Sequence, residues 1–191
     1  MANTEIKRTP SSTGSTTKAT LSMWFKRSNT TDATQGIYFA NSGAGAWFRV
    51  WLFADHRLEI RASGSGQTQL QLNTYRKLRD VNAWYHLVVA IDLTQSTAND
   101  KVKVYINGVR ETNWETQTNP TVSTAEWVGT SASYKPSFGC DPNENTNFFD
   151  GSMSHINFID GTAYDATAFG STDTTTGEWK IKTSPSVTYG T

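Results

Sequence analysis

Side chains that could hold a metal ion are concentrated between positions 141 and 150. Carboxylates and amides occur there at Asp141, Asn143, Glu144 and Asp150, and oxygen donors of this kind are the ligands that calcium prefers. The spacing matches no fixed coordination pattern, and loops rich in Asn and Asp also form turns without an ion, because their side chains cap nearby backbone groups. A calcium site and a plain turn are both open interpretations, and no other cofactor is expected.

A second group of residues suits sugar binding, which requires an aromatic platform and polar groups that fix the hydroxyls. We take Asn113, Trp114 and Tyr134 as the predicted carbohydrate contacts, because they lie in or beside expected turns and loops. The alternative for Trp114 and Tyr134 is burial under a loop or against a neighbouring subunit. Four other tryptophans lie in expected strands, where packing is the ordinary explanation: Trp24, Trp47, Trp51 and Trp84.

Patterns typical of an enzyme are missing from the sequence. Glucan hydrolases need two carboxylates on one face of a strand, but the pattern Glu-x-Asp-x-x-Glu does not occur, and Asp55 and Glu59 with their arginine neighbours indicate a solvated strand edge. The three histidines lie on separate segments and Cys140 has no CxxC partner, so a zinc site is poorly supported. His86 is expected to be a hydrogen-bonded structural residue. We therefore expect a protein that is not an enzyme.

Composition limits the partners further. Lysine plus arginine and aspartate plus glutamate number 17 each, so no net charge draws the chain to nucleic acid or to an anionic membrane. Apolar runs fall short of the roughly 20 residues that span a bilayer, and residues 1–18 lack the apolar stretch of a signal peptide. We expect no nucleic acid, no membrane insertion and, with a single cysteine, assembly in a reducing cytoplasm.

Short stretches of alternating apolar and polar residues predict strands along most of the chain. Residues 21–25, 57–62 and 102–106 alternate clearly, and the nearly continuous apolar run 84–93 suits a strand buried at the centre of a sheet. Only 75–81 and 165–169 favour helix, and both are too short for more than a turn or two. The pattern predicts an all-β fold with two packed antiparallel sheets.

The chain is long enough for one sandwich domain. We expect an extended polar N-terminal arm at 1–18, the sandwich at 19–170, and an extended C-terminal segment at 171–191.

Two sets of motifs resemble known proteins. The stretch 84–92, Trp-Tyr-His-Leu-Val-Val-Ala-Ile-Asp, with 102–108, Val-Lys-Val-Tyr-Ile-Asn-Gly, resembles the paired central strands of concanavalin A-like, laminin-G-like domains. Residues 8–12, 24–28, 149–153 and 156–161 resemble the opening and closing segments of such domains in bacteriophage structural proteins. The first resemblance implies a jelly-roll sandwich, and the second implies a virion component.

The resemblance implies a non-enzymatic protein of the virion surface, such as a tail fibre, a spike or a capsid decoration, made in the host cytoplasm. Its jelly roll would assemble with copies of itself, as a homo-oligomer, and with other virion structural proteins, because unpaired strand edges and extended arms can be completed by another chain. The alternative is a lectin-like domain that recognises a host surface glycan. A third interpretation, a cell-surface laminin-G-like adhesion module, is weakened by the missing signal peptide and disulfide.

Overall fold

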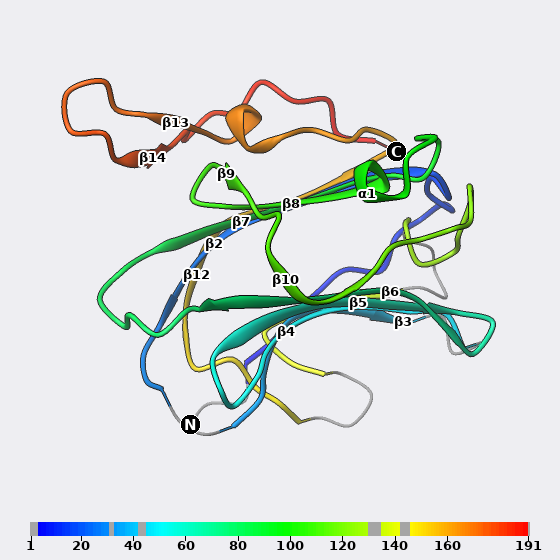
Figure 1. Cartoon of the computed structure of the whole chain (residues 1–191), viewed down its shortest axis with the longest axis horizontal. Coiled ribbons are helices and arrows are strands. Elements are labelled where there is room, and N and C mark those ends of the chain that lie inside the picture. Colours follow the sequence, from blue (N-terminus) through cyan, green and yellow to red (C-terminus); the bar gives the residue numbers. More distant parts are fainter. Residues whose placement is uncertain (1–3, 31–32, 42–44, 130–134, 142–145, 191) are drawn as a thin grey trace.

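Two antiparallel sheets lie face to face, and a small two-stranded ribbon lies outside the second sheet (Figure 1). The computed structural model describes residues 4–30, 33–41, 45–129, 135–141 and 146–190. The prediction of an all-β sandwich with two antiparallel sheets is confirmed. None of the helices in these ranges is long and apolar enough to span a membrane.

The first sheet has seven strands in the spatial order β1-β11-β3-β4-β5-β6-β10. Its strands β3 to β6 form a continuous antiparallel meander, in which each strand pairs with the next one along the chain. The bounds are β1 (Ile6–Lys7), β3 (Gln35–Asn41), β4 (Trp47–Leu52), β5 (Arg57–Gly64), β6 (Gln67–Lys77), β10 (Trp114–Thr118) and β11 (Lys135–Phe138).

The second sheet has five strands in the order β12-β2-β7-β8-β9. Its bounds are β2 (Lys18–Arg27), β7 (Tyr85–Asp92), β8 (Val102–Ile106), β9 (Val109–Arg110) and β12 (Gly151–Asp160), with the short helix α1 (Ala98–Lys101) before β8. Strand β7 lies at the centre, as its apolar run predicted. The turn between β8 and β9 uses Asn107 and Gly108, both at positive φ, which is the conformation that this residue pair favours in tight hairpins.

The core fills the space between the sheets. Alternation along each strand sends every second side chain inward, so Leu21, Met23 and Phe25 of β2 meet Val50 of β4 and Ile60 of β5, all at most 1% exposed. Full burial of such a side chain contributes about 1.5–3 kcal/mol. The core therefore fixes which residues of β4, β5 and β6 must point outward.

The C-terminal segment covers the outer face of the five-stranded sheet (Figure 1). It consists of the 3-10 helix η1 (Ala166–Ala168) and the ribbon formed by β13 (Gly170–Thr172) and β14 (Trp179–Ile181). A second apolar cluster joins the two layers: Val88, Ile159, Ala166 and Phe169. The short helical turn predicted at 165–169 is confirmed, and the expected domain boundary at 170 falls inside β13.

Residues 75–81 are not helical, contrary to the sequence-based expectation. Strand β6 continues to Lys77, where it pairs with Arg57, and the backbone N–H of Leu58 donates to the Thr74 hydroxyl at 3.0 Å. Pairing with β5 therefore decides the conformation that local sequence left open.

The described part of the predicted N-terminal arm, residues 4–18, joins both sheets, because its last residue, Lys18, begins β2 and pairs with Asp92 of β7. Within residues 1–18, Ile6 and Lys7 form β1 and pair with Phe138 and Ser137 of β11. Part of the arm is thus an edge strand of the seven-stranded sheet.

Candidate functional site

Three large side chains project from the outer face of β4, the face turned away from the core. Burial alternates along this strand: the side chains at 48, 50 and 52 are buried, and Trp47, Arg49 and Trp51 are partly exposed. Since successive side chains of a strand point to opposite faces, these three share one surface. The sequence-based expectation that Trp47 and Trp51 pack in the core is therefore wrong, because both side chains lie on the outer face of the sheet.

The Arg49 guanidinium lies against both indoles. Its central carbon Cζ is 3.7 Å from the ring centre of Trp51 and 5.0 Å from that of Trp47. The Cζ atom of Arg61, on β5, lies 5.5 Å from the ring centre of Trp47. Cations within about 6 Å of an aromatic ring centre are attracted by the ring electrons, so the arginines and indoles hold one another in place.

Strands β5 and β6 bring polar partners to the same surface. The strand register pairs Arg49 with Arg61, Trp51 with Glu59, and Glu59 with Asn73. The Arg49 Nε atom donates to Glu59 Oε2 at 3.0 Å, and Arg49 Nη2 lies 2.8 Å from the same oxygen. Together these six residues, Trp47, Arg49, Trp51, Glu59, Arg61 and Asn73, form what we call the outer-face site.

The ion pair in the outer-face site is largely shielded from water. The side chain of Glu59 is 1% exposed and that of Arg49 is 17% exposed. Burial lowers the pKa of the Arg49 guanidinium, whereas the Glu59 charge opposes this shift. Removing one partner of a buried ion pair typically costs about 3–5 kcal/mol, so this pair forms a firmly positioned centre for the site.

Several polar atoms of the outer-face site have no hydrogen-bond partner among the described residues. They are Nε1 of Trp51, Nε of Arg61 and Oδ1 of Asn73, and all three are covered by neighbouring atoms. An unpaired buried polar group costs about 1–3 kcal/mol. Two unpaired donors and one unpaired acceptor on one sheet face are typical of a surface that is completed by a ligand or by ordered water.

Described residues that follow β11, Cys140 and Asn147, pack against Gly36 of β3 beside this surface. A Cβ atom on Gly36 would lie 3.1 Å from the Cys140 carbonyl carbon, and the Gly36 N–H donates to the Asn147 carbonyl oxygen at 2.6 Å. Gly36 is opposite Trp51 in the strand register. Asp141, 5% exposed, favours the charged form of Arg49 and, together with Glu59, opposes the lowering of the Arg49 pKa by burial. These residues bound the outer-face site on the β3 side.

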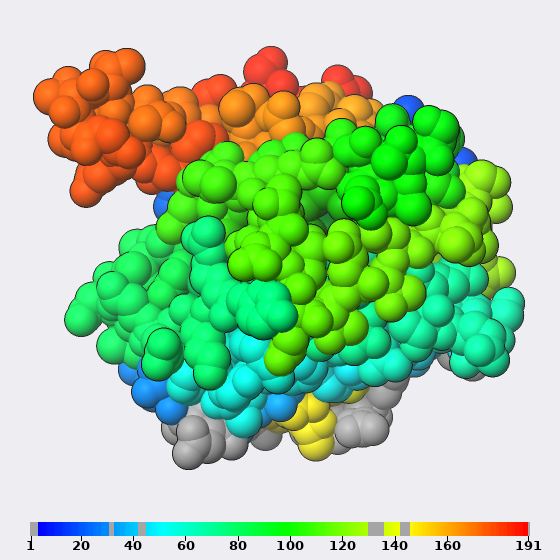
Figure 2. Space-filling view, in the orientation of Figure 1, coloured from blue at the N-terminus to red at the C-terminus, as the bar shows by residue number. Residues whose placement is uncertain are grey.

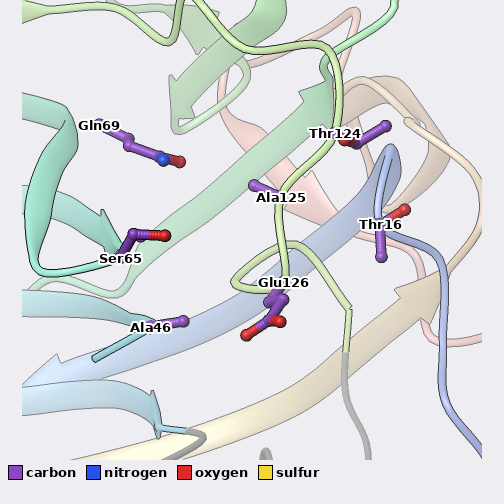
Figure 3. Close-up of a pocket in the computed structure, with 8 residues that line it drawn as sticks. Thr16, Ala46, Ser65, Gln69, Thr124, Ala125 and Glu126 are labelled. Carbon is purple, nitrogen blue, oxygen red and sulfur yellow. The ribbon is translucent and has the colours of Figure 1, made fainter. Parts of the chain in front are cut away.

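A separate pocket of about 390 Å³ lies at the end of the sandwich near the β5–β6 turn (Figure 3). Its volume falls within the range of about 300–1,000 Å³ that is usual for small-ligand sites. We call it the rim pocket, lined by Thr16, Ala46, Gly64, Ser65, Gln69, Thr124, Ala125 and Glu126.

Two of the three predicted carbohydrate residues, Asn113 and Trp114, lie in the described part of the chain. Trp114 is half-buried and packs against the core, and the cleft beside it has a volume of about 100 Å³, well below the usual range for ligand sites. Asn113 is exposed, and its backbone N–H donates to Glu111 at 3.3 Å. Tyr134 lies outside the described residues. Trp114 thus packs against the core, and carbohydrate contact by these residues stays a prediction.

The calcium prediction is only partly covered by the described residues. Asp150 accepts a hydrogen bond from Asn29, and the Asp141 backbone pairs with Thr146. Asn143 and Glu144 lie outside the described ranges. Across those ranges no group of three His, Cys, Asp or Glu side chains is arranged to hold a metal ion, so calcium binding stays a prediction.

His86 is a hydrogen-bonded structural residue, as predicted. It is 0% exposed, and its Nδ1 atom accepts from the Trp179 indole N–H at 2.9 Å. Because an indole N–H can only donate, the ring proton lies on Nε2 and is donated to the Ser22 hydroxyl at 3.1 Å. Burial lowers the pKa of His86 to about 4, so the ring is neutral at pH 7.

The sequence from residue 2 to residue 167 matches the family model for the concanavalin A-like lectin/glucanases superfamily. The chain belongs to this superfamily. The resemblance of residues 84–92 and 102–108 to a concanavalin A-like, laminin-G-like domain is thereby confirmed. Among curated proteins, none matches the sequence.

Solved structures with the superfamily fold include several binding domains. The LG1-3 region of the laminin α2 chain has a TM-score of 0.59 and 11% identity, over 85% of this chain and 30% of that one. The CBM40 of a Ruminococcus gnavus sialidase bound to α2,3-sialyllactose has a TM-score of 0.58 and 12% identity, over 87% and 97%. Domain 4 of the Geobacillus stearothermophilus arabinanase AbnA, in complex with arabinotriose, has a TM-score of 0.54 and 23% identity, over 79% and 64%. Identities this low show a shared fold alone.

Sequence reasoning missed the outer-face site. It assigned Trp47 and Trp51 to packing and Glu59 to a solvated strand edge, but β5 is an interior strand and Glu59 is 1% exposed. The available signal was the alternation of Trp-x-Arg-x-Trp at 47–51 with Arg-x-Glu-x-Arg at 57–61. In neighbouring strands such a pattern places aromatic and charged side chains on one face.

Proposed function

We propose that this chain is a non-enzymatic carbohydrate-binding domain and that the outer-face site is where the sugar binds. The observation that carries the proposal is the shielded Arg49–Glu59 pair beside two indoles, surrounded by polar atoms without partners. The lectin-type fold of the superfamily supports it.

The chemistry of the unpaired atoms favours a hydroxylated ligand. Trp51 and Arg61 offer N–H donors, whereas Asn73 offers a carbonyl acceptor. Sugar hydroxyls both donate and accept, so they suit this mixture of donors and acceptor once the neighbouring atoms that cover these groups move aside. A purely anionic ligand would leave the Asn73 oxygen unpaired. The indoles offer the aromatic contact that a sugar face requires.

The shielded ion pair suits recognition more than stability. A buried pair can often be replaced by apolar residues without loss of stability, so its presence on the outer face has little structural justification. Held by Glu59 and by the indoles, the Arg49 guanidinium, 17% exposed, presents charged donors whose hydrogen bonds are stronger than those of neutral groups. Prior fixation of these groups reduces the ordering cost when a sugar binds.

A glycan array followed by calorimetry tests the proposal, with α2,3-sialyllactose and arabinotriose among the first compounds. We expect saturable binding of at least one glycan, weakened at least about tenfold by Trp47→Ala and by Arg61→Gln, since each removes a contact worth about 1.4 kcal/mol or more. Trp84→Ala is the matched control, because Trp84 is 41% exposed and lies outside the site.

Two results would reject the proposal. One is no binding across the array by the folded chain, and the other is binding that Trp47→Ala and Arg61→Gln leave unchanged. If Trp114→Ala abolished binding instead, the site would be the cleft beside Trp114 that the sequence first suggested.

A virion setting for this domain stays a prediction, supported by the resemblance of residues 149–153 and 156–161 to phage structural proteins. Immunogold electron microscopy of purified phage particles, with an antibody against this chain, tests it. Label over the head favours a decoration or fibre, and label on tail appendages favours host attachment. Particles that stay unlabelled, although the epitope is accessible, would argue for a free lectin-like or adhesion domain.

A further inference from the structure

We propose that the rim pocket is a second binding site, distinct from the outer-face site, and that it takes a neutral hydroxylated molecule the size of one sugar residue or a smaller polyol. The pocket has a volume of about 390 Å³. Its lining residues come from four separate segments of the chain, around residues 16, 46, 64–69 and 124–126, and three of these segments supply polar side chains.

Gln69 is fixed in the orientation that a ligand would need. Its Oε1 atom accepts from the Trp127 indole N–H at 2.7 Å, and the Trp127 side chain is 0% exposed. This bond fixes which end of the amide is the oxygen, so the Gln69 NH₂ group is the end that can donate to a ligand. Figure 3 shows the tip of Gln69 directed from β6 toward the cavity.

Two glycines make this arrangement possible. A Cβ atom on Gly64 would lie 2.5 Å from Gln69 Nε2, and one on Gly129 would lie 2.4 Å from the Ser15 carbonyl oxygen. The Ala125 N–H donates to the Thr16 carbonyl oxygen at 2.8 Å. The N-terminal segment is thus joined to the opposite wall, and the pocket is pre-formed, as ligand sites usually are.

The lining selects the class of ligand. Among the described residues it offers the Gln69 amide, the Glu126 carboxylate and three hydroxyl groups, with no aromatic and no basic side chain. An anion would meet only the like charge of Glu126, and an apolar molecule would gain little by leaving water. Calcium takes six to eight oxygen ligands, usually with several carboxylates, and only one carboxylate lines the pocket. Hydroxyl groups, which donate and accept, match the lining.

The rim pocket and the outer-face site open on different sides of the sheet. Ala46 and Trp47 are adjacent in sequence, but Ala46 is 3% exposed and belongs to the core side, whereas Trp47 lies on the outer face. A ligand in one site can therefore be told apart from a ligand in the other by the residues that respond.

Nuclear magnetic resonance on the ¹⁵N-labelled full chain tests the inference. The probes are glycerol, D-glucose, D-galactose, D-mannose, N-acetyl-D-glucosamine and L-arabinose, each titrated alone. We expect at least one to shift the Gln69 side-chain NH₂ and the Trp127 indole N–H saturably, with a dissociation constant in the millimolar range or below. Thr124→Val combined with Glu126→Gln should raise this constant about tenfold, as the first change removes a hydrogen bond and the second removes the charge that strengthens another.

The controls separate this inference from the proposed function. Trp47→Ala should leave the Gln69 titration unchanged, and thermal unfolding verifies that each variant is folded; Thr124 and Glu126 are exposed. Probes that shift the Trp47 and Trp51 indoles but never Gln69 would overturn the rim-pocket inference and leave the outer-face proposal standing. An unchanged dissociation constant in the Thr124/Glu126 double variant would also overturn it.

Discussion

The outer faces of the two sheets are treated differently by the same chain. The outer face of the five-stranded sheet lies under the C-terminal segment, and we call it the covered face (Figure 1). The outer face of the seven-stranded sheet carries the outer-face site, and we call it the open face. The space-filling view shows the C-terminal segment as a separate layer, part of which projects beyond the sandwich (Figure 2).

Tryptophans on the two faces show what this difference means. On the covered face, Trp179 stacks on His86 with ring centres 6.0 Å apart, and His86 stacks on Trp24 at 4.8 Å. The indole N–H of Trp179 is paired, whereas that of Trp51 on the other face has no described partner. The contrast holds for Trp179 and Trp51 and not for every indole, because the Trp24 indole N–H on the covered face also has no partner among the described residues. Trp179 is held by contacts inside the chain, whereas we propose that Trp51 contacts a ligand.

The largest effect should come from breaking the ion pair on the open face. Arg49→Met leaves the buried Glu59 carboxylate without its partner, and we expect the free energy of unfolding to fall by about 3–5 kcal/mol. The double variant Arg49→Met, Glu59→Met should recover most of this loss while sugar binding stays absent. Urea denaturation measures the first and calorimetry the second. A double variant as unstable as the single one would show that the pair serves stability.

Acid should weaken the covered face next. Burial lowers the pKa of His86 to about 4, whereas the unfolded chain takes up this proton near pH 6.5. The neutral ring therefore makes its full contribution to the free energy of unfolding above about pH 6.5. As the pH falls from 6.5 to 4 this contribution is lost, by about 3 kcal/mol in total. Urea titrations at several pH values measure this slope.

The His86→Gln variant is the control for this pH dependence. Between pH 6.5 and 4, the free energy of unfolding of this variant should lack the loss of about 3 kcal/mol that His86 causes in the wild-type protein. Both proteins should lose stability further below pH 4, because Asp92 becomes protonated there: burial alone would raise its pKa, but hydrogen bonds from Thr94, Gln95 and Lys18 lower it to about 2. A wild-type slope that persists in the variant would contradict the assignment to His86.

Removing the indole on the covered face should have a moderate effect. Trp179 is half-buried and fits between two glycines: added Cβ atoms would lie 2.3 Å from its ring at Gly108 and 2.5 Å at Gly170. Trp179→Ala should lower the free energy of unfolding by about 2 kcal/mol, less than the 3–5 kcal/mol for a fully buried aromatic residue. Thermal unfolding with Trp84→Ala as the exposed counterpart checks this, and equal losses in the two variants would speak against the comparison.

The smallest change in stability should come from the open face. Trp47→Ala removes a side chain that touches mainly the ends of two arginines, so we expect a loss within about 1 kcal/mol together with the tenfold loss of sugar affinity. Denaturation and calorimetry on the same preparation compare the two. A loss of about 2 kcal/mol or more would show that Trp47 stabilises the fold as Trp179 does, and would contradict the proposed difference between the two faces.

The alternation of apolar and polar residues predicted the sandwich correctly, because packing between the two sheets requires every second side chain of a strand to be apolar. Strands β4, β5 and β7 bury their apolar residues in the order that the sequence displays, and Asn107-Gly108 marks its hairpin directly. The end of β6 could not be read in this way, since residues 75–77 are all exposed and polar or aromatic, and only their pairing with β5 makes them a strand.

The outer-face site escaped prediction for a related reason. A tryptophan in a strand gives the same local sequence pattern whether it faces the core or the solvent. The pairing of Glu59 with Asn73 depends in addition on two irregularities in the β5–β6 register, which the sequence does not reveal. The partners of His86 were equally hidden, because Trp179 lies 93 positions away along the chain.

The position of β2 also affects how the chain must be made. This strand lies between β7 and β12, and its pairing residues Arg27 and Gly151 are separated by about 120 positions. At a synthesis rate of about 5–20 residues per second, one edge of β2 waits roughly 6 to 25 seconds for its partner to be made. During that time an apolar strand is open to mispairing with other nascent chains, so efficient production depends on delayed collapse or on chaperone protection of this edge.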